Sequence, residues 1–368
     1  MKIDPVALLQ NLIRIPSVNP DGDPGIAEAS EARLAEFLRE FLQTAGAEAE
    51  LREVLPGRPN VIARFPTNRA GKPRMLLAPH TDTVSVAGMT IEPFSGELRE
   101  GRIWGRGASD TKGPMAAMLA ALVELGGEIA DLDWEIWFAG LMGEEAGLHG
   151  SRALANEEHF DFVIVGEPTE MRAVHAHKGA AWLKVVASGR SAHASTPEAG
   201  VNAIDALLAA LEEFRARFEE TRVRHQDPTL GFSTLNLSVI HGGSKVNIVP
   251  SRCEALVDMR VVPGFPVEEL VKGLQTSHPG FEVTLHSSPP LFTATTHPMF
   301  RTLEAAGIPP TTAPWFCDAA PFSEKGIAAI ALGPGSIAQA HIADESIAVD
   351  ALCDGAVQLT RFLRSLAS

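Results

Sequence analysis

Acidic and imidazole side chains follow several short apolar runs of this 368-residue sequence. Runs such as RMLLAP, WEIWFAGLMG and DFVIVG are typical of buried strands, and open α/β sheets bind ligands at the carboxyl ends of their strands. Carboxylate and imidazole donors without cysteine suit Zn²⁺, Co²⁺ or Mn²⁺. The pattern therefore indicates a metal centre at one edge of a sheet. The residues concerned are His80, Asp82, Asp110, Glu144, Glu145, Glu167 and His341.

Two pairs within this set carry geometric information. His80 and Asp82 are two residues apart on an extended segment, so their side chains point the same way. Glu144 and Glu145 are adjacent, and neighbouring carboxylates repel each other unless a cation or a proton lies between them. The side chains of neighbouring residues diverge, so one carboxylate of the second pair can bind metal while the other faces a water molecule.

Each residue also has a structural explanation when it is taken alone. A single histidine at a strand end is more often a hydrogen-bonded structural residue, and a pair of glutamates is usually solvated. Asp110 could cap the helix that begins near Pro114. The combination of two imidazoles with this many carboxylates favours the metal hypothesis over the separate explanations.

The composition argues against several classes of protein. There are 31 basic and 46 acidic residues, which gives a formal charge of −15, and no cluster of Lys and Arg is present to bind nucleic acid. The three cysteines are far apart, which predicts reduced thiols in a cytosol. The N-terminus does not resemble a secretory signal, and no run approaches the ~18 apolar residues of a membrane span. We expect a soluble cytoplasmic protein that binds neither nucleic acid nor a membrane.

Motifs of other enzyme classes are missing or incomplete. The sequence has no tyrosine, no G-x-S-x-G elbow, no H-E-x-x-H helix and no Walker loop. The segment from Gly333 to Ala338 matches G-x-G-x-x-A after an apolar run. A dinucleotide site needs a helix at that point, and the following QAHIADES shows no apolar helical face. A dinucleotide oxidoreductase is therefore only a competing hypothesis.

Helical and strand patterns alternate along most of the chain. This order predicts an α/β fold with a mixed, largely parallel sheet flanked by helices. Apolar residues at helical spacing predict helices over 28–45 and 114–125 and a helix at the C-terminus. Short apolar runs predict strands over 60–65, 74–79, 134–141, 161–165 and 328–332.

The pattern changes in the middle of the chain. Strands that alternate polar and apolar residues, with two helical segments between them, predict a four-stranded α+β domain. The strands are expected over 181–187, 235–240, 253–261 and 281–286. We therefore expect a discontinuous α/β domain, residues 1–176 and 287–368, interrupted by an inserted domain, residues 177–286.

Several longer segments, in order from residue 80 to 345, give the most specific signal. Together they resemble the di-metal deacylase and exopeptidase family, which includes acetylornithine deacetylase, succinyl-diaminopimelate desuccinylase, aminoacylase and glutamate carboxypeptidase. The segments are HTDTV, GRGASDTKGPMAAML, GEEAGLHGS, VGEPT, AHKG, GRSAHASTPEAGVNAI, KVNIVPSRCEALVDMR and GPGSIAQAHIADE. The resemblance implies a catalytic domain that binds two divalent ions, with zinc expected first and cobalt or manganese as alternatives.

The resemblance assigns a role to each residue of the expected centre. Asp110 would bridge two metal ions, with His80 and Glu167 completing one ion and Glu145 and His341 the other. Glu144 would be the general base, and Asp82 would orient His80 through the second ring nitrogen of that histidine. In this family a cis peptide often follows the bridging acid, which here would be the bond between Asp110 and Thr111.

The resemblance also makes the inserted domain a lid and dimerisation domain. His193 would reach the active site of a partner subunit and contact the scissile carbonyl oxygen. Asn247 and Arg260 would hold the carboxylate end of the substrate, since a guanidinium offers a paired fork of donors. A homodimer is therefore expected.

The chemistry implied by the resemblance is hydrolysis of the amide bond of an N-acylated amino acid. Two divalent ions about 3.5–4 Å apart can hold a bridging water and lower its pKa, and Glu144 would take the proton of that water. The segment CDAAPFSEKGIAAIALGPGSIAQAHIADE is most similar to acetylornithine deacetylases, so N2-acetylornithine is the expected substrate. The alternatives are a desuccinylase or a glutamate-type carboxypeptidase of the same family, and a metal-free binding dimer of the same fold.

Overall fold

The chain divides into two compact units in the computed structural model, which describes residues 3–21 and 30–367. Unit 1 is formed by the described parts of Met1–Ala176, Leu291–Thr312 and Cys317–Ser368. Unit 2 is formed by His177–Pro290 and Ala313–Phe316. Each unit has its own hydrophobic core, so each is described separately.

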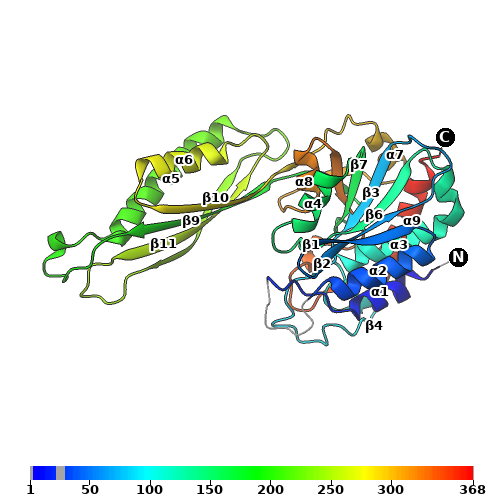
Figure 1. The fold of residues 1–368 in the computed structure, drawn as a ribbon, viewed down its shortest axis with the longest axis horizontal. Helices are drawn as coiled ribbons and strands as arrows, with labels where there is room; N and C mark the ends of the chain where they lie inside the picture. The colour runs from blue at the N-terminus through cyan, green and yellow to red at the C-terminus, as the bar shows by residue number, and fades with distance from the viewer. Residues whose placement is uncertain (1–2, 22–29, 368) are drawn as a thin grey trace. The chain divides into compact units, whose positions relative to one another are not determined.

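A mixed sheet with helices on both sides forms unit 1 (Figure 1). The strands of this sheet are β1 (Glu48–Leu55), β2 (Arg58–Arg64), β3 (Arg74–Pro79), β6 (Glu135–Gly140), β7 (Phe162–Gly166), β8 (Ala173–His177), β13 (Leu291–Phe292), β14 (Pro310–Ala313) and β15 (Ala328–Leu332). A small second sheet is formed by β4 (Glu97–Arg99), β5 (Arg102–Trp104) and β16 (Ser346–Ala348). The helices are α1 (Pro5–Ile13), α2 (Ala32–Thr44), α3 (Lys112–Leu125), α4 (His149–Glu157), α7 (Met299–Ala305), α8 (Ala319–Glu324) and α9 (Val349–Arg364), with 3-10 turns η1 (Gly126–Asp131) and η3 (Ile337–Gln339).

The centre of the large sheet is parallel and its flanks are antiparallel. Strands β6, β3, β7 and β15 are neighbours in that order, and each adjacent pair is parallel. The pairs β1–β2, β2–β6 and β15–β8 are antiparallel. Since the four central strands run in one direction, their carboxyl ends lie at the same edge of the sheet. The expected α/β class is confirmed, and these four central strands supply parallel pairs of the sheet.

Helix α3 is the core helix of unit 1. It packs against β3 and β7 on one side and against α1 and α9 on the other. Nearly all of its side chains are buried, including Met115, Met118 and Leu122. Among the described residues, Lys112–Asp131 is the only helical segment whose length and composition would allow it to cross a membrane. Most of that segment is buried in unit 1, as expected for a core helix, so it is weak support for a membrane span.

Unit 2 is an antiparallel sheet covered on one face by two helices (Figure 1). The strand order is β10–β11–β9–β12, with β9 at Gly179–Ser188, β10 at Thr234–Gly242, β11 at Arg252–Val261 and β12 at Glu282–Ser288. The helices are α5 (Ala203–Arg224) and α6 (Val267–Ser277), and η2 (Pro197–Ala199) is a short 3-10 turn. Asn202 caps α5 by accepting hydrogen bonds from the backbone N–H groups of Ile204 and Asp205.

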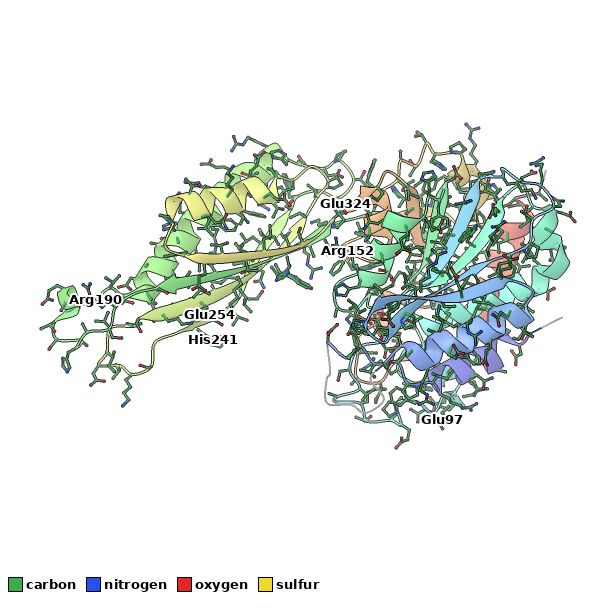
Figure 2. The ribbon with its side chains drawn as sticks, viewed as in Figure 1. Glu97, Arg152, Arg190, His241, Glu254 and Glu324 are labelled. Carbon is green, nitrogen blue, oxygen red and sulfur yellow. The ribbon has the colours of Figure 1, made fainter. Side chains whose placement is uncertain are left out.

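The two faces of the unit 2 sheet differ because side chains alternate along each strand. In β11, Cys253, Ala255 and Val257 are buried beneath the helices. Glu254 lies on the opposite face, and its register partner across the strands is His241 of β10 (Figure 2). This alternation is the pattern expected for a sheet with one solvated face.

Most predicted elements occur within a few residues of their expected positions. The predicted strands 74–79 and 328–332 have the same limits as β3 and β15. The helix predicted over 28–45 corresponds to α2, but residues 28 and 29 lie outside the described residues. The strand before Gly333 is followed by a 3-10 turn of only three residues, η3. A dinucleotide-binding helix is therefore missing from this described segment, which contradicts the competing oxidoreductase hypothesis.

We expect Phe218→Ala to lower the free energy of unfolding by ~3–5 kcal/mol. Phe218 of α5 is fully buried, and the centroid of its ring lies 5.2 Å from the ring centroid of Phe265. Urea unfolding followed by circular dichroism measures the change. The matched control is Val223→Ala in the same helix, where the side chain is 66% exposed. Similar destabilisation by both variants would show that α5 does not pack as described.

Candidate metal centre

The ends of the central parallel strands supply part of the predicted donor set. His80 follows β3 directly, and Glu167 follows β7 directly. Glu144 and Glu145 lie in the loop between β6 and α4. These side chains meet because parallel strands end at the same edge of the sheet.

Asp110 and His341 come from irregular segments. Asp110 precedes α3, and the Asp110–Thr111 peptide bond is cis, as the family resemblance predicts. Thr111 donates a hydrogen bond from Oγ1 to the carbonyl oxygen of Gly166 at 2.6 Å, which fixes this turn beside the end of β7. His341 follows η3 and has a positive φ of 60°.

Asp110 lies between two imidazoles. Its Oδ1 atom is 3.0 Å from Nε2 of His80, and its Oδ2 atom is 3.3 Å from Nε2 of His341. Nε2 of His341 is also 3.0 Å from Oε2 of Glu145. The two oxygens of one carboxylate therefore face two different groups of donors.

Three groups of potential ligands have donor atoms within 4.8 Å of one another. One contains His80, Asp110 and Glu167, and a second contains Asp110, Glu145 and His341. The third contains His80, Glu144 and Glu145 and so overlaps the others. The first two groups share only Asp110, which is the arrangement expected of a carboxylate that bridges two ions.

The charges in this region are only partly compensated. Burial raises the pKa of Glu145 to about 7, and the charge of Asp110 contributes to this shift. Burial, with Asp110 again contributing, raises the pKa of Glu167 well above its usual range. Burial also raises the pKa of Glu144, and the charges of Glu167 and Glu145 add to that effect.

The imidazoles compensate the charge of Asp110 itself. Burial alone would raise the pKa of Asp110, but hydrogen bonds with His341 and His80 outweigh burial and hold it below its usual value. The same bond with Asp110, together with one to Glu145, raises the pKa of His341 to about 10. Positive charge is thus favoured between these carboxylates.

The donor set fits divalent metal ions. Oε1 of Glu145 and Oε1 of Glu167 are buried and have no hydrogen-bond partner within the described part of the chain. An unpaired buried carboxylate oxygen is costly, and a cation removes that cost. Carboxylates and imidazoles without thiolates are the ligands of zinc, cobalt and manganese sites.

Asp82 organises the loop that carries the glutamate pair. Its Oδ1 accepts a hydrogen bond from the backbone N–H of Glu144 at 3.0 Å, and its Oδ2 accepts one from Glu145 at 2.9 Å. Nδ1 of His80 is 3.5 Å from Oδ1 of Asp82 but only 2.9 Å from the carbonyl oxygen of Asp82. The aspartate therefore contacts both the histidine and the glutamate loop.

Sequence patterns gave no role to two buried residues near this centre. Nδ2 of Asn19 donates to Oδ2 of Asp82 at 2.7 Å, a contact across 63 residues of sequence. Asp318 is fully buried, accepts a hydrogen bond from Ser151, and has no partner for Oδ2 among the described residues. Burial raises the pKa of Asp318 to about 7. The burial of Asp318 and its contact with Ser151 become visible only in the folded chain.

The three remaining predicted site residues belong to unit 2. His193 is exposed, and its Nδ1 lies 2.7 Å from Oγ of Ser195. Asn247 is exposed, and its backbone carbonyl oxygen accepts a hydrogen bond from the backbone N–H of Ala194. Arg260 is half-buried and donates from Nε and Nη2 to Asp258.

A mixed α/β sheet with carboxylates and imidazoles gathered near its strand ends fits the class of metal-dependent hydrolases. Comparison with known proteins supports the same class. The family model described as peptidase family M20/M25/M40 matches residues 76–365. The chain belongs to this family and is a hydrolase of the metallopeptidase and amidohydrolase type, which confirms the family and the enzyme class expected from the sequence.

Individual relatives agree with this assignment. The chain is 31% identical to a protein named acetylornithine deacetylase from Photorhabdus laumondii, over 94% of this chain and 93% of that protein. A tripeptidase structure from Staphylococcus aureus has a TM-score of 0.78 at 22% identity and covers 99% of this chain and 98% of its own. A dinuclear metal binding peptidase of family M20 from Bacillus subtilis has a TM-score of 0.67 at 13% identity, over 98% and 96% of the two chains.

We expect Gly113→Ala to disturb the centre through the turn that carries Asp110. A Cβ atom at Gly113 would lie 2.4 Å from the carbonyl oxygen of Ala108, so the backbone of this turn must move. Overpacking of this kind costs ~1–3 kcal/mol, and the displaced turn should also weaken zinc retention during dialysis. Urea unfolding and metal analysis measure both effects.

Gly127→Ala is the matched control, because a Cβ atom there would meet nothing within 4 Å. This control should retain zinc and stability. Wild-type zinc retention by Gly113→Ala would contradict the role given to the turn.

Proposed function

We propose that this hydrolase cleaves the amide bond of an N-acylated amino acid, with N2-acetylornithine as the preferred substrate and ornithine and acetate as products. The proposal rests chiefly on one observation, the two donor groups that share Asp110 beside Glu144. The relatives named acetylornithine deacetylase support the choice of substrate. In this proposal the chain acts in the cytoplasm, in amino-acid biosynthesis.

The proposed metal ligands are the members of the two groups of donor residues that share Asp110. His80 and Glu167 would hold one ion, Glu145 and His341 the other, and Asp110 both. When bound, the two divalent ions, zinc in the first instance and cobalt or manganese as alternatives, supply the Lewis acidity that makes water nucleophilic near neutral pH.

Glu144 is the proposed general base. It takes a proton from the attacking water and passes it to the departing amine, which would otherwise leave as a poor, strongly basic group. Its position supports this role, because the backbone of Glu144 is held by Asp82 and its side chain lies among the donors of the centre. Asp82 is proposed to keep both His80 and the Glu144 loop in place.

Unit 2 is proposed to act as the lid and dimerisation domain of a homodimer, with residues 177–286 as its main part. His193, from a partner subunit, would donate a hydrogen bond to the carbonyl oxygen as negative charge develops there. Arg260 and Asn247 would bind the carboxylate of the substrate. Arg260 uses Nε and Nη2 for Asp258, so Nη1 is the proposed contact with the substrate.

We expect Glu144→Gln to bind metal normally and to lose about 10²–10⁴-fold in kcat, the range of general acid–base catalysis. An amide cannot accept the proton of water, but it preserves the size of the side chain. Metal analysis and steady-state kinetics measure the two properties. Glu97→Gln is the control, because Glu97 is an exposed residue of β4 (Figure 2). Full turnover in the Glu144 variant would rule out this residue as the base.

A substrate panel tests the specificity. We expect kcat/KM to be highest for N2-acetylornithine, compared with N-succinyl-diaminopimelate and acyl-glutamates. A strong chelator should abolish the activity, because Lewis acidity is lost, and zinc or cobalt should restore it. A higher kcat/KM for either competing substrate would move the assignment to a desuccinylase or a carboxypeptidase. Activity that is indifferent to the chelator would contradict the metal-dependent mechanism.

A further inference from the structure

Three proposed ligands, Asp110, Glu145 and His341, do not lie directly at strand ends, and Asp82 already holds the backbone of Glu145. Asp110 lies in a turn before α3, and His341 lies in a loop where its side chain is 57% exposed. Loops are less rigid than strands, so a site with fixed ligand geometry needs other contacts to hold these two segments. The contacts in question converge on Glu345, four residues after His341.

The Glu345 carboxylate is fully buried and fully hydrogen-bonded. Oε1 accepts from the backbone N–H groups of Ser109 at 2.7 Å and Asp110 at 2.8 Å. Oε2 accepts from the N–H of Gly107 at 2.8 Å and from Nη1 of Arg106 at 2.9 Å. The side chain of one loop thus binds the backbone of the turn that carries the bridging acid.

Arg106 extends this connection to the His341 loop. Its guanidinium is also buried, and Nη1 donates to the carbonyl oxygen of Ile342 at 3.2 Å, next to His341. Nε donates to the carbonyl oxygen of Ser85 at 3.1 Å, in the segment that follows Asp82. The Arg106–Glu345 pair therefore joins three segments that carry residues of the centre.

From these contacts we infer that Glu345, together with Arg106, is a positioning residue that fixes Asp110 and His341 relative to each other and so sets the metal affinity of the centre. This inference rests on the proposed metal-dependent function. Neither residue is among the ligand groups, so both act through the backbone of the segments they connect. Residues of this kind orient ligands, and changing them typically weakens metal binding by about 10–100-fold.

The carboxylate is required for this role because four donors face it from two sides. A glutamine side chain can accept hydrogen bonds at its oxygen but presents an N–H₂ group at the other end. That group would face backbone N–H donors, so part of the turn would have to move. The segment carrying Asp110 would then lose its fixed position without any change to a ligand.

The test compares cobalt and zinc binding by the full-length wild type and by Glu345→Gln. Competition with a chromophoric chelator gives the affinities, and the visible absorption of bound cobalt reports ligand geometry. We expect the variant to bind about 10–100-fold more weakly and to show an altered cobalt spectrum. Neither readout depends on substrate.

Glu135→Gln is the matched control. Glu135 is also a buried glutamate of unit 1, paired with Arg64 at 3.0 Å, but it lies at the start of β6, away from the strand ends that form the centre. This control should lose stability and keep wild-type metal affinity and cobalt spectrum. A loss of affinity in Glu135→Gln equal to that in Glu345→Gln would mean that general destabilisation is the cause, and it would overturn the inference.

Arg106→Lys provides a second test of the positioning role if Glu345→Gln fails to fold. A single ammonium cannot contact Ile342, Ser85 and Glu345 in the fork geometry of a guanidinium, so weaker cobalt binding is expected here too. Wild-type affinity and spectrum in a folded variant of either residue would overturn the inference while leaving the proposed function intact. A wild type that binds two ions but hydrolyses no N-acylated amino acid would overturn only the proposed function, and a wild type that binds no metal would overturn both.

Discussion

Repulsion among buried carboxylates is the main physical constraint on the candidate metal centre of unit 1. Glu144, Glu145 and Glu167 lie near Asp110 in a region where burial and mutual charge raise the pKa values of all three glutamates. Removing ionised groups from water is costly unless opposite charge is close by. The two imidazoles compensate Asp110, but Oε1 of Glu145 and Oε1 of Glu167 have no hydrogen-bond partner in the described structure. A pair of divalent ions would complete this balance, which is the chemistry that the family membership implies.

The fold brings these charges together in two ways. The parallel strands β3 and β7 end side by side, so the rigid sheet places His80 and Glu167 directly. Asp110 and His341 lie on irregular backbone and depend on long-range hydrogen bonds, especially those of the buried Arg106–Glu345 pair. The sheet fixes the position of a ligand at a strand end. The position of a ligand in a loop depends on the contacts that hold the loop in place.

Unit 2 is built independently of this charge cluster. Its core forms between α5, α6 and one face of the sheet, while the other face carries polar residues such as Glu254 and Lys184. Arg260 and Asp258 already form a hydrogen-bonded pair on this unit. The proposed substrate contact of Arg260 would therefore come from a side chain that is already hydrogen-bonded to Asp258.

The sequence by itself determined the elements whose apolar pattern is local, such as β3 and β15, and the alternating strand β11. It also indicated the family and the residue types of the candidate metal centre, because the ligand residue types and the order of the motifs can be read directly from the sequence. Strand β1 and the small sheet of β4, β5 and β16 were not predicted, since they are short or partly exposed and have no strong periodicity. Only the tertiary structure decided which oxygen of Asp110 faces which histidine, and that Glu345 binds backbone 235 residues away. Hydrogen bonding and desolvation depend on distances of a few ångströms between atoms, and such distances between remote segments exist only once the chain is folded.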